Sequence, residues 1–276
     1  MATVAELLGC AAGLPGDSPR RDAEILLGHC LGESRSWLYT WPEKNVEPEQ
    51  ERYYRRLLRE RETGKPVAYL TGSREFWSLN LAVNNATLIP RPETETLVSW
   101  ALELPLSGEA GVLDLGTGSG AIALALAVER PEWTITAVDS SEEALAVARK
   151  NAQSNRLEAV HFLSSGWYSE LHAMRFDLVV ANPPYIDGRD EHLQRGDVRF
   201  EPRRALVAPE GGLADIRHIV SEAHKHMTPG GWLLLEHGFE QGDDVRRLFS
   251  AAGFHTIETR LDFGGNERIT GGSLPC

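Results

Sequence analysis

Short apolar runs alternate with helical segments through the second half of the chain, and this alternation limits the possible folds more than any other feature. Apolar runs near 112–115, 134–138, 160–163, 176–181 and 232–236 indicate strands, and segments near 121–128, 142–151, 214–227 and 243–252 indicate helices. Two further extended stretches, near 255–260 and 267–270, follow. Strands that alternate with helices predict an α/β fold with a parallel sheet covered on both faces.

The first part of the chain has a different pattern. Residues 3–12, 20–31 and 48–62 predict helices, the second with Ser18-Pro19 at its start and the third opened by Pro48. From Trp77 the apolar period becomes two, with Leu79, Leu81 and Val83, which predicts a strand or hairpin with Phe76 on the opposite face. We therefore expect a helical domain at 1–73, a linking hairpin at 74–90 and an α/β domain at 91–276.

Five arginines follow one another along the predicted helix 48–62: Arg52, Arg55, Arg56, Arg59 and Arg61. The simpler interpretation is a solvated face balanced by neighbouring glutamates. The alternative is a contact surface for an acidic or RNA-bearing partner.

Composition and charge exclude several classes of protein. No apolar run reaches membrane-spanning length, the N-terminus lacks a basic secretory start, and the three cysteines are far apart, so we expect a cytoplasmic protein with no membrane partner. The nine histidines show no metal-ligand spacing, so we expect no metal. Residues 1–75 carry 11 basic and 12 acidic side chains, whereas the remainder carries 17 and 28. Such an acidic body disfavours direct binding to duplex DNA.

A glycine-rich turn follows the first predicted strand of the α/β part, in the run Asp114-Leu115-Gly116-Thr117-Gly118-Ser119-Gly120. Glycines here allow positive φ and close approach of the backbone to a ligand. Asp139 ends the next strand, where a carboxylate can accept both ribose hydroxyls. NAD enzymes share these features, but Asp114 offers a partner for the ammonium of an amino acid-bearing cofactor such as S-adenosylmethionine, or else orients the loop. Trp167 is either a flat face for adenine or a core residue.

The run Asn182-Pro183-Pro184-Tyr185 follows the apolar strand 176–181. Each proline holds the residue before it extended. The Asn182 side-chain oxygen and the Pro183 carbonyl therefore form a rigid acceptor pair suited to a planar NH2 group, with the Tyr185 ring beside it. Asn-Pro alone would indicate only a turn, but the complete run after a buried strand favours a functional site.

Two further segments have open interpretations. Ile89-Pro90-Arg91-Pro92-Glu93-Thr94-Glu95 is either an ordinary capped helix start or part of the lining of the site. Residues 187–204 hold five acidic residues and five arginines, and a loop this long beside a site is a candidate lid.

Taken together, Asp114–Gly120, Asp139 and Asn182–Tyr185 resemble a class I S-adenosylmethionine-dependent methyltransferase that methylates amino groups. Further stretches over nearly the whole chain resemble the HemK/PrmC family, the peptide chain release factor glutamine methyltransferases: Arg20–Leu27, Arg74–Trp77, Ile89–Glu95, Gly196–Pro202 and Asn266–Arg268. Adenine-N6 DNA methyltransferases share the Asn-Pro-Pro-Tyr run and are the alternative.

The resemblance implies a Rossmann-like, mostly parallel sheet with an antiparallel terminal strand, preceded by a small helical domain that helps bind the release factor. It implies S-adenosylmethionine as cofactor, with S-adenosylhomocysteine as product, and a monomeric enzyme that methylates N5 of the glutamine in the Gly-Gly-Gln motif of class-1 release factors. The implied residues are Gly116, Thr117, Gly118, Ser119 and Gly120 around the methionine end, Asp139 on the ribose, Trp167 against adenine, Asn182 beside the cofactor, and Asn182, Pro183, Pro184 and Tyr185 on the substrate, with Asn182, Pro183 and Tyr185 as catalytic residues.

One position departs from the family pattern. Family members usually carry an acidic residue directly before the tryptophan, placed to accept from the adenine amino group, and this chain has Gly166 there. We expect a backbone carbonyl or water to replace that acceptor, with weaker recognition of adenine.

Overall fold

The chain divides into two units, neither of which is continuous in sequence. The computed structural model describes residues 1–16 and 18–276. The first unit comprises Met1–Ser73 together with Glu191–Phe200, and the second comprises Arg74–Asp190 together with Glu201–Cys276. A boundary at residue 73 therefore leaves ten residues of the expected α/β domain in the helical unit.

The first unit is helical around an apolar core. Its helices are α1 (Val4–Gly9), α2 (Pro19–Leu31), α3 (Arg35–Thr40), α4 (Pro48–Glu62) and α5 (Val67–Thr71). Leu7, Leu26, Leu38 and Tyr54 meet in the core and are almost fully buried. The short α3 and α5 were not predicted, because five or six residues give too little periodicity to detect.

The interpretation of the five arginines as a solvated face is wrong for Arg61. Its side chain is buried, and its guanidinium bonds Asp22 at 2.8 Å, Asp197 at 3.0 Å, and the carbonyls of Pro15 and Lys65. Arg52, Arg55, Arg56 and Arg59 are exposed. Arg61 therefore holds segments of the first unit together rather than facing solvent.

A two-stranded hairpin is formed by β1 (Ser73–Phe76) and β2 (Leu79–Ala82), and all of it except Ser73 belongs to the second unit. Trp77 was expected within a strand, but it forms the turn with Ser78, and both residues have positive φ (50° and 62°). Two-residue hairpin loops require this backbone conformation. Glu95 and Glu129 fix Trp77 by accepting from its backbone and indole N–H groups at 3.0 and 2.8 Å.

The core of the second unit is a seven-stranded sheet with the order β10-β11-β9-β6-β3-β4-β5. Strands β5, β4, β3, β6 and β9 are parallel, whereas β11 is antiparallel to both β9 and β10. The strands are β3 (Gly111–Leu115), β4 (Thr134–Asp139), β5 (His161–Ser164), β6 (Phe176–Ala181), β9 (Met227–Glu236), β10 (His255–Leu261) and β11 (Glu267–Ser273). The predicted mostly parallel sheet with an antiparallel terminal strand is confirmed.

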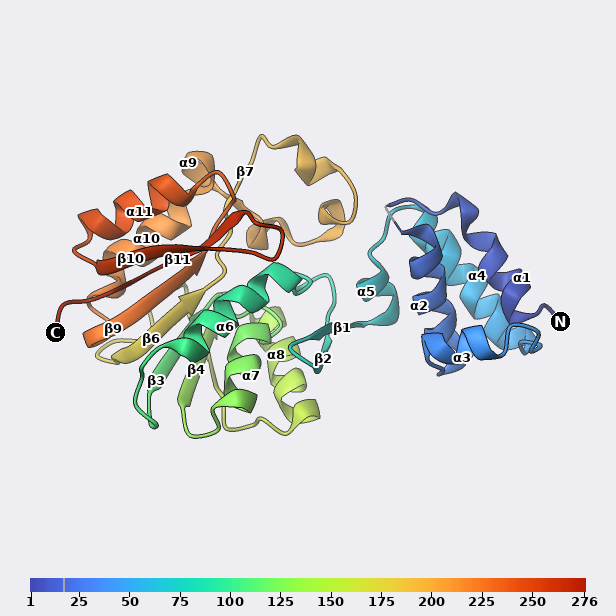
Figure 1. The fold of residues 1–276 in the computed structure, drawn as a ribbon, viewed down its shortest axis with the longest axis horizontal. Helices are drawn as coiled ribbons and strands as arrows, with labels where there is room; N and C mark the ends of the chain where they lie inside the picture. The colour runs from blue at the N-terminus through green and yellow to red at the C-terminus, as the bar shows by residue number, and fades with distance from the viewer. Residues whose placement is uncertain (17) are drawn as a thin grey trace. The chain divides into compact units, whose positions relative to one another are not determined.

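Helices cover both faces of this sheet, as Figure 1 shows. One face packs against α6 (Glu95–Glu103), α7 (Ala121–Glu129) and α8 (Glu142–Asn155), and the other against α10 (Ala214–Ala223) and α11 (Gly242–Ala251). Neighbouring strand residues alternate between the two cores: Leu178 and Val180 belong to the first, Val179 and Ala181 to the second. A doubly covered strand of this kind is apolar throughout, which is why its sequence shows no alternation.

The segment after the Asn-Pro-Pro-Tyr run has little regular structure. Strands β7 (Ile186–Asp187) and β8 (Val207–Ala208) pair in parallel, followed by α9 (Pro209–Gly212). Gly212 has φ of +87°, and a Cβ there would lie 2.0 Å from the Tyr185 carbonyl oxygen. Only glycine can occupy this position, and it brings the chain directly against the Asn-Pro-Pro-Tyr run.

Candidate active site

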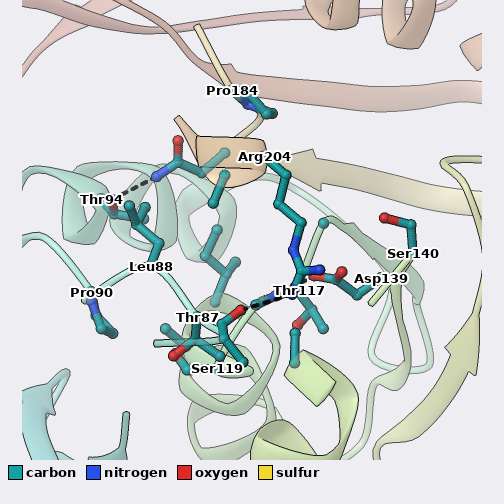
Figure 2. A pocket seen from close by; sticks show the side chains of 18 of the residues that line it. Thr87, Leu88, Pro90, Thr94, Thr117, Ser119, Asp139, Ser140, Pro184 and Arg204 are labelled. Carbon is teal, nitrogen blue, oxygen red and sulfur yellow. Dashed lines mark hydrogen bonds between the residues drawn. The ribbon is translucent and has the colours of Figure 1, made fainter. Parts of the chain in front are cut away.

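A cavity of about 280 Å³ opens at the carboxyl ends of β3, β4, β5 and β6. In parallel α/β sheets, ligands bind beyond the carboxyl ends of the strands, at the point where the strand order reverses. Here that reversal falls between β3 and β6. Figure 2 shows Thr94 on one side of the cavity and Asp139 and Ser140 on the other.

The glycine loop forms one end of the cavity through its backbone. Gly116, Gly118 and Gly120 all have positive φ, and the N–H groups of Gly116 and Thr117 both donate to the Val138 carbonyl at 2.9 Å. A Cβ on Gly116 would lie 3.2 Å from the Trp167 ring. The loop therefore presents bare backbone toward the space that a ligand would fill.

Asp114 orients this loop from below. It is fully buried, and its Oδ2 accepts from the Thr117 hydroxyl at 2.6 Å and from the Ala123 N–H at 3.2 Å. Its Oδ1 has no hydrogen-bond partner among the described residues. Burial raises the pKa of Asp114 to about 7. Of the two roles considered for Asp114, the geometry agrees with loop orientation, since the carboxyl is not among the groups that line the cavity.

Asp139 ends β4 at the cavity wall with its carboxylate held in place. Its Oδ2 accepts from the Gly118 N–H at 2.9 Å and its Oδ1 from the Ser141 N–H at 2.8 Å. A carboxylate has about four acceptor positions, so each oxygen retains one for a ligand hydroxyl. Asp139 thus fixes the glycine loop through a hydrogen bond and also offers a ligand two acceptor positions of fixed geometry. We call Gly116–Ser119 with Asp139 the glycine-loop end of the cavity.

Trp167 lies beside this end, and its position is compatible with both of the roles considered for it. It lines the cavity and also packs against the apolar core under α10. Its backbone has φ of +54°, and its indole N–H donates to Asp215 at 3.2 Å. Gly166 lines the cavity as well, and a Cβ there would meet only the Ser169 hydroxyl at 3.7 Å.

Several lining residues were not predicted. Asp215 comes from the first turn of α10, and Arg204 reaches the cavity from the segment before β8, donating to the Ser141 hydroxyl at 2.6 Å. The cavity is also lined by Ala86, Thr87, Leu88, Pro90, Arg91 and Thr94, so the Ile89–Glu95 run contributes to the site rather than only starting a helix. A lone Asp at a helix start and an Arg in a charged loop carry no sequence signal for a site, whereas the proline-rich run did.

The Asn182 end of the cavity, which we define as Thr94, Asn182 and Pro184, is built from side chains. Asn182 Nδ2 donates to Thr94 Oγ1 at 3.2 Å, and the Thr94 hydroxyl donates to Glu236 Oε2 at 2.6 Å. Tyr185 donates its hydroxyl to Glu236 Oε1 at 3.2 Å. Burial raises the pKa of Glu236, and burial raises that of Tyr185 as well.

The structure brings most of the predicted site residues to one cavity. Those that line it are Gly116, Thr117, Gly118, Ser119, Asp139, Trp167, Asn182 and Pro184. Gly120 caps α7, and Pro183 and Tyr185 continue the chain beyond Asn182 without joining the lining. Tyr185 lies instead in the second core, where Gln241 donates to its carbonyl at 3.0 Å. The ring is thus placed by packing rather than by exposure to the cavity.

In residues 1–16 and 18–276, no group of three His, Cys, Asp or Glu side chains is arranged to hold a metal ion. Within the same residues, every helix is too short or too polar to span a bilayer.

A sheet of this order, with a glycine loop after its first strand and an acid at the end of the second, defines a class I methyltransferase. Residues 94–228 match the methyltransferase small domain family, and residues 11–72 match the PrmC N-terminal domain family. A solved methyltransferase from Pyrococcus furiosus shares the fold with a TM-score of 0.55, at 18% identity over 72% of this chain and 90% of that chain.

Relatives that match nearly the whole chain identify the family within this class of methyltransferases. The release factor glutamine methyltransferase of Salmonella typhimurium is 53% identical over 93% of this chain and 92% of its own. That of Pseudomonas aeruginosa is 51% identical over 100% of both chains. The chain belongs to the release factor glutamine methyltransferase family.

Proposed function

We propose that the protein transfers a methyl group from S-adenosylmethionine to N5 of the glutamine in the Gly-Gly-Gln motif of class-1 peptide chain release factors. The observation that carries this proposal is the position of Asn182, at the end of β6 and in the wall of the same cavity as the glycine loop. A donor of methyl groups and a planar amide could therefore meet in one space.

The glycine-loop end fits S-adenosylmethionine. Bare backbone at Gly116 leaves room beside Trp167, and the two free acceptor positions of Asp139 suit a pair of ribose hydroxyls. When bound, the cofactor supplies a methyl group on a positively charged sulfur. Gly116 to Ser119 would hold its methionine part, Asp139 its ribose, and Trp167 its adenine, with Asn182 beside it.

The Asn182 end would bind the glutamine side chain. The Asn182 Oδ1 and the Pro183 carbonyl would accept the two N–H bonds of the amide, orienting a nitrogen whose lone pair is otherwise delocalised into its carbonyl. Positioning of this kind can contribute several of the ~7–11 kcal/mol available from ideal alignment. Pro184 and Tyr185 would fix the backbone that carries these acceptors, and the product proton would leave after transfer.

The protein substrate is favoured over a DNA adenine by two features. The part of the chain after residue 75 has 28 acidic against 17 basic residues, which opposes binding to a polyphosphate. The curated relatives that span nearly the whole chain are named as release factor glutamine methyltransferases. On this proposal the helical domain at 1–73 helps bind the release factor, and the enzyme works as a cytoplasmic monomer.

The experiment is incubation of the purified protein with S-adenosylmethionine and an unmethylated release factor, followed by mass spectrometry of the Gly-Gly-Gln peptide. We expect a gain of one methyl group on the glutamine, release of S-adenosylhomocysteine, and no transfer to a Gly-Gly-Ala factor or to adenine-containing duplex DNA. An unchanged glutamine in the presence of bound cofactor, measured by calorimetry, would contradict the proposal.

A further inference from the structure

Glu236 stands behind the Asn182 end of the cavity, where the reaction itself gives it no part. It is the last residue of β9, whose Leu235 pairs with Ala181 of β6, so its strand position is level with Asn182. Its side chain is 1% exposed, and the described residues place no Lys, Arg or His nitrogen within ion-pair distance of it. Two hydroxyls, those of Thr94 and Tyr185, donate to its two oxygens.

The hydrogen bonds from Asn182 to Thr94 and from Thr94 to Glu236 run in one direction. The Thr94 hydroxyl donates to Glu236 Oε2 at 2.6 Å, so its single proton is committed to Glu236. The Thr94 oxygen then faces Asn182 with a lone pair, and Asn182 must present its NH2 group, at 3.2 Å. The opposite orientation would set two acceptors against each other and leave a polar group unsatisfied, which is costly at a site this enclosed.

We propose that Glu236 is a positioning residue that, through Thr94, fixes the polarity of the Asn182 carboxamide, so that Oδ1 and not NH2 faces the substrate. This inference rests on the proposed function, because it explains why the site accepts a substrate that donates hydrogen bonds. An Asn side chain that could turn over would present NH2 half of the time, and it would then favour a carboxylate over an amide. Glu236 thus determines selectivity for glutamine over glutamate.

The test compares two release factors, one with Gly-Gly-Gln and one with Gly-Gly-Glu, for binding to the protein in the presence of S-adenosylhomocysteine by calorimetry. The wild-type protein should prefer the glutamine factor. Thr94→Val, which keeps the shape of the side chain but removes the hydroxyl, should reduce that preference by about tenfold or more, because a site built to receive hydrogen-bond donors discriminates strongly.

Three further variants separate positioning from general damage. Thr94→Ser keeps the hydroxyl and should restore the preference. Thr270→Val removes a buried hydroxyl on β11 that hydrogen-bonds His237, the residue after β9, and Thr259 of β10; it makes no hydrogen bond to Thr94, Asn182 or Glu236 and should leave the preference unchanged. Glu236→Gln gives the network a donor and should also weaken the preference, so it serves if Thr94→Val does not fold.

The outcomes are distinguishable from failure of the proposed function. If the wild-type protein does not methylate the glutamine factor, the function is wrong. If it does, and both Thr94→Val and Glu236→Gln keep the wild-type ratio of affinities, the positioning role is wrong. An equal loss of affinity for both release factors, with an unchanged ratio of the two affinities, would also overturn the positioning role, because that result indicates only a structural role.

Discussion

The two ends of the cavity are built on different principles. At the glycine-loop end, two carboxylates hold the loops that follow β3 and β4: Asp139 accepts from the backbone N–H groups of Gly118 and Ser141, and Asp114 accepts from the Thr117 hydroxyl. At the Asn182 end, the side chains of Asn182 and Thr94 form one hydrogen-bonded series with Glu236 behind them. The first end is therefore fixed by local backbone geometry, and the second by side chains that only the complete fold brings together.

This difference has a consequence for mutation. Damage at the glycine-loop end should appear in loop stability and cofactor affinity, whereas damage at the Asn182 end should appear in turnover of the substrate. The following changes separate these effects, beginning with the largest.

The largest effect concerns the buried Asp114 under the glycine loop. Its pKa is raised to about 7 from 3.8, so its contribution to stability is greatest below pH 4 and is lost as the pH rises to about 7. A pKa shift of this size lowers the contribution of Asp114 to the free energy of unfolding by about 4 kcal/mol between pH 4 and pH 8. Urea denaturation of the wild type and of Asp114→Asn over this range should show the difference in unfolding free energy moving in favour of the variant; a difference independent of pH would contradict the interpretation.

Asn182→Ala breaks the other end. Loss of one acceptor at the reacting amide should raise the barrier by about 3 kcal/mol, which slows turnover roughly a hundredfold or more, by analogy with loss of a single oxyanion donor. Steady-state kinetics should show this loss while calorimetry shows largely retained affinity for the cofactor. Asn80→Ala, an exposed site on β2, is the control. Near-normal turnover by the Asn182 variant would remove this residue from the mechanism.

Asp139→Asn should act on the cofactor alone. Asparagine has one side-chain oxygen in place of two, so one of the two backbone N–H groups now bound would face an NH2 group. We expect cofactor affinity to fall by about 2 kcal/mol, or about 30-fold, with turnover at saturating cofactor close to that of the wild type. Asp243→Asn, on the exposed start of α11, is the matched control. An equal loss of turnover would show that the two ends are not independent.

Gly166→Asp should give the smallest effect, and it should strengthen cofactor binding rather than weaken it. The position has room for a side chain, and a carboxylate there would supply the acceptor that the family resemblance implies for this position. We expect cofactor affinity to increase by about 1 kcal/mol, or about fivefold, in calorimetry. Gly166→Ala separates the carboxylate from the added Cβ. Unchanged affinity in the Asp variant would mean that the acceptor does not matter.

The sequence predicted the sheet and the glycine-loop end well for a physical reason. Buried parallel strands are short apolar runs, and the residues that follow each strand meet at one edge, so Gly116, Asp139 and Asn182 could be placed together in advance. Thr94 and Glu236 could not, because their link depends on the register of β6 and β9 and on side-chain rotamers. Trp77 was misplaced because its turn uses positive φ without a glycine, held by glutamates from distant helices.

The discontinuous first unit affects how the protein can form during its synthesis. The helices from Met1 to Ser73 leave the ribosome first, and Arg61 can then bind Asp22 and the carbonyls of Pro15 and Lys65. Its other carboxylate, Asp197, belongs to the same unit but is made more than a hundred residues later. The helical unit is therefore complete only after most of the sheet has been translated, so an N-terminal fragment that ends at Ser73 lacks part of its own structure.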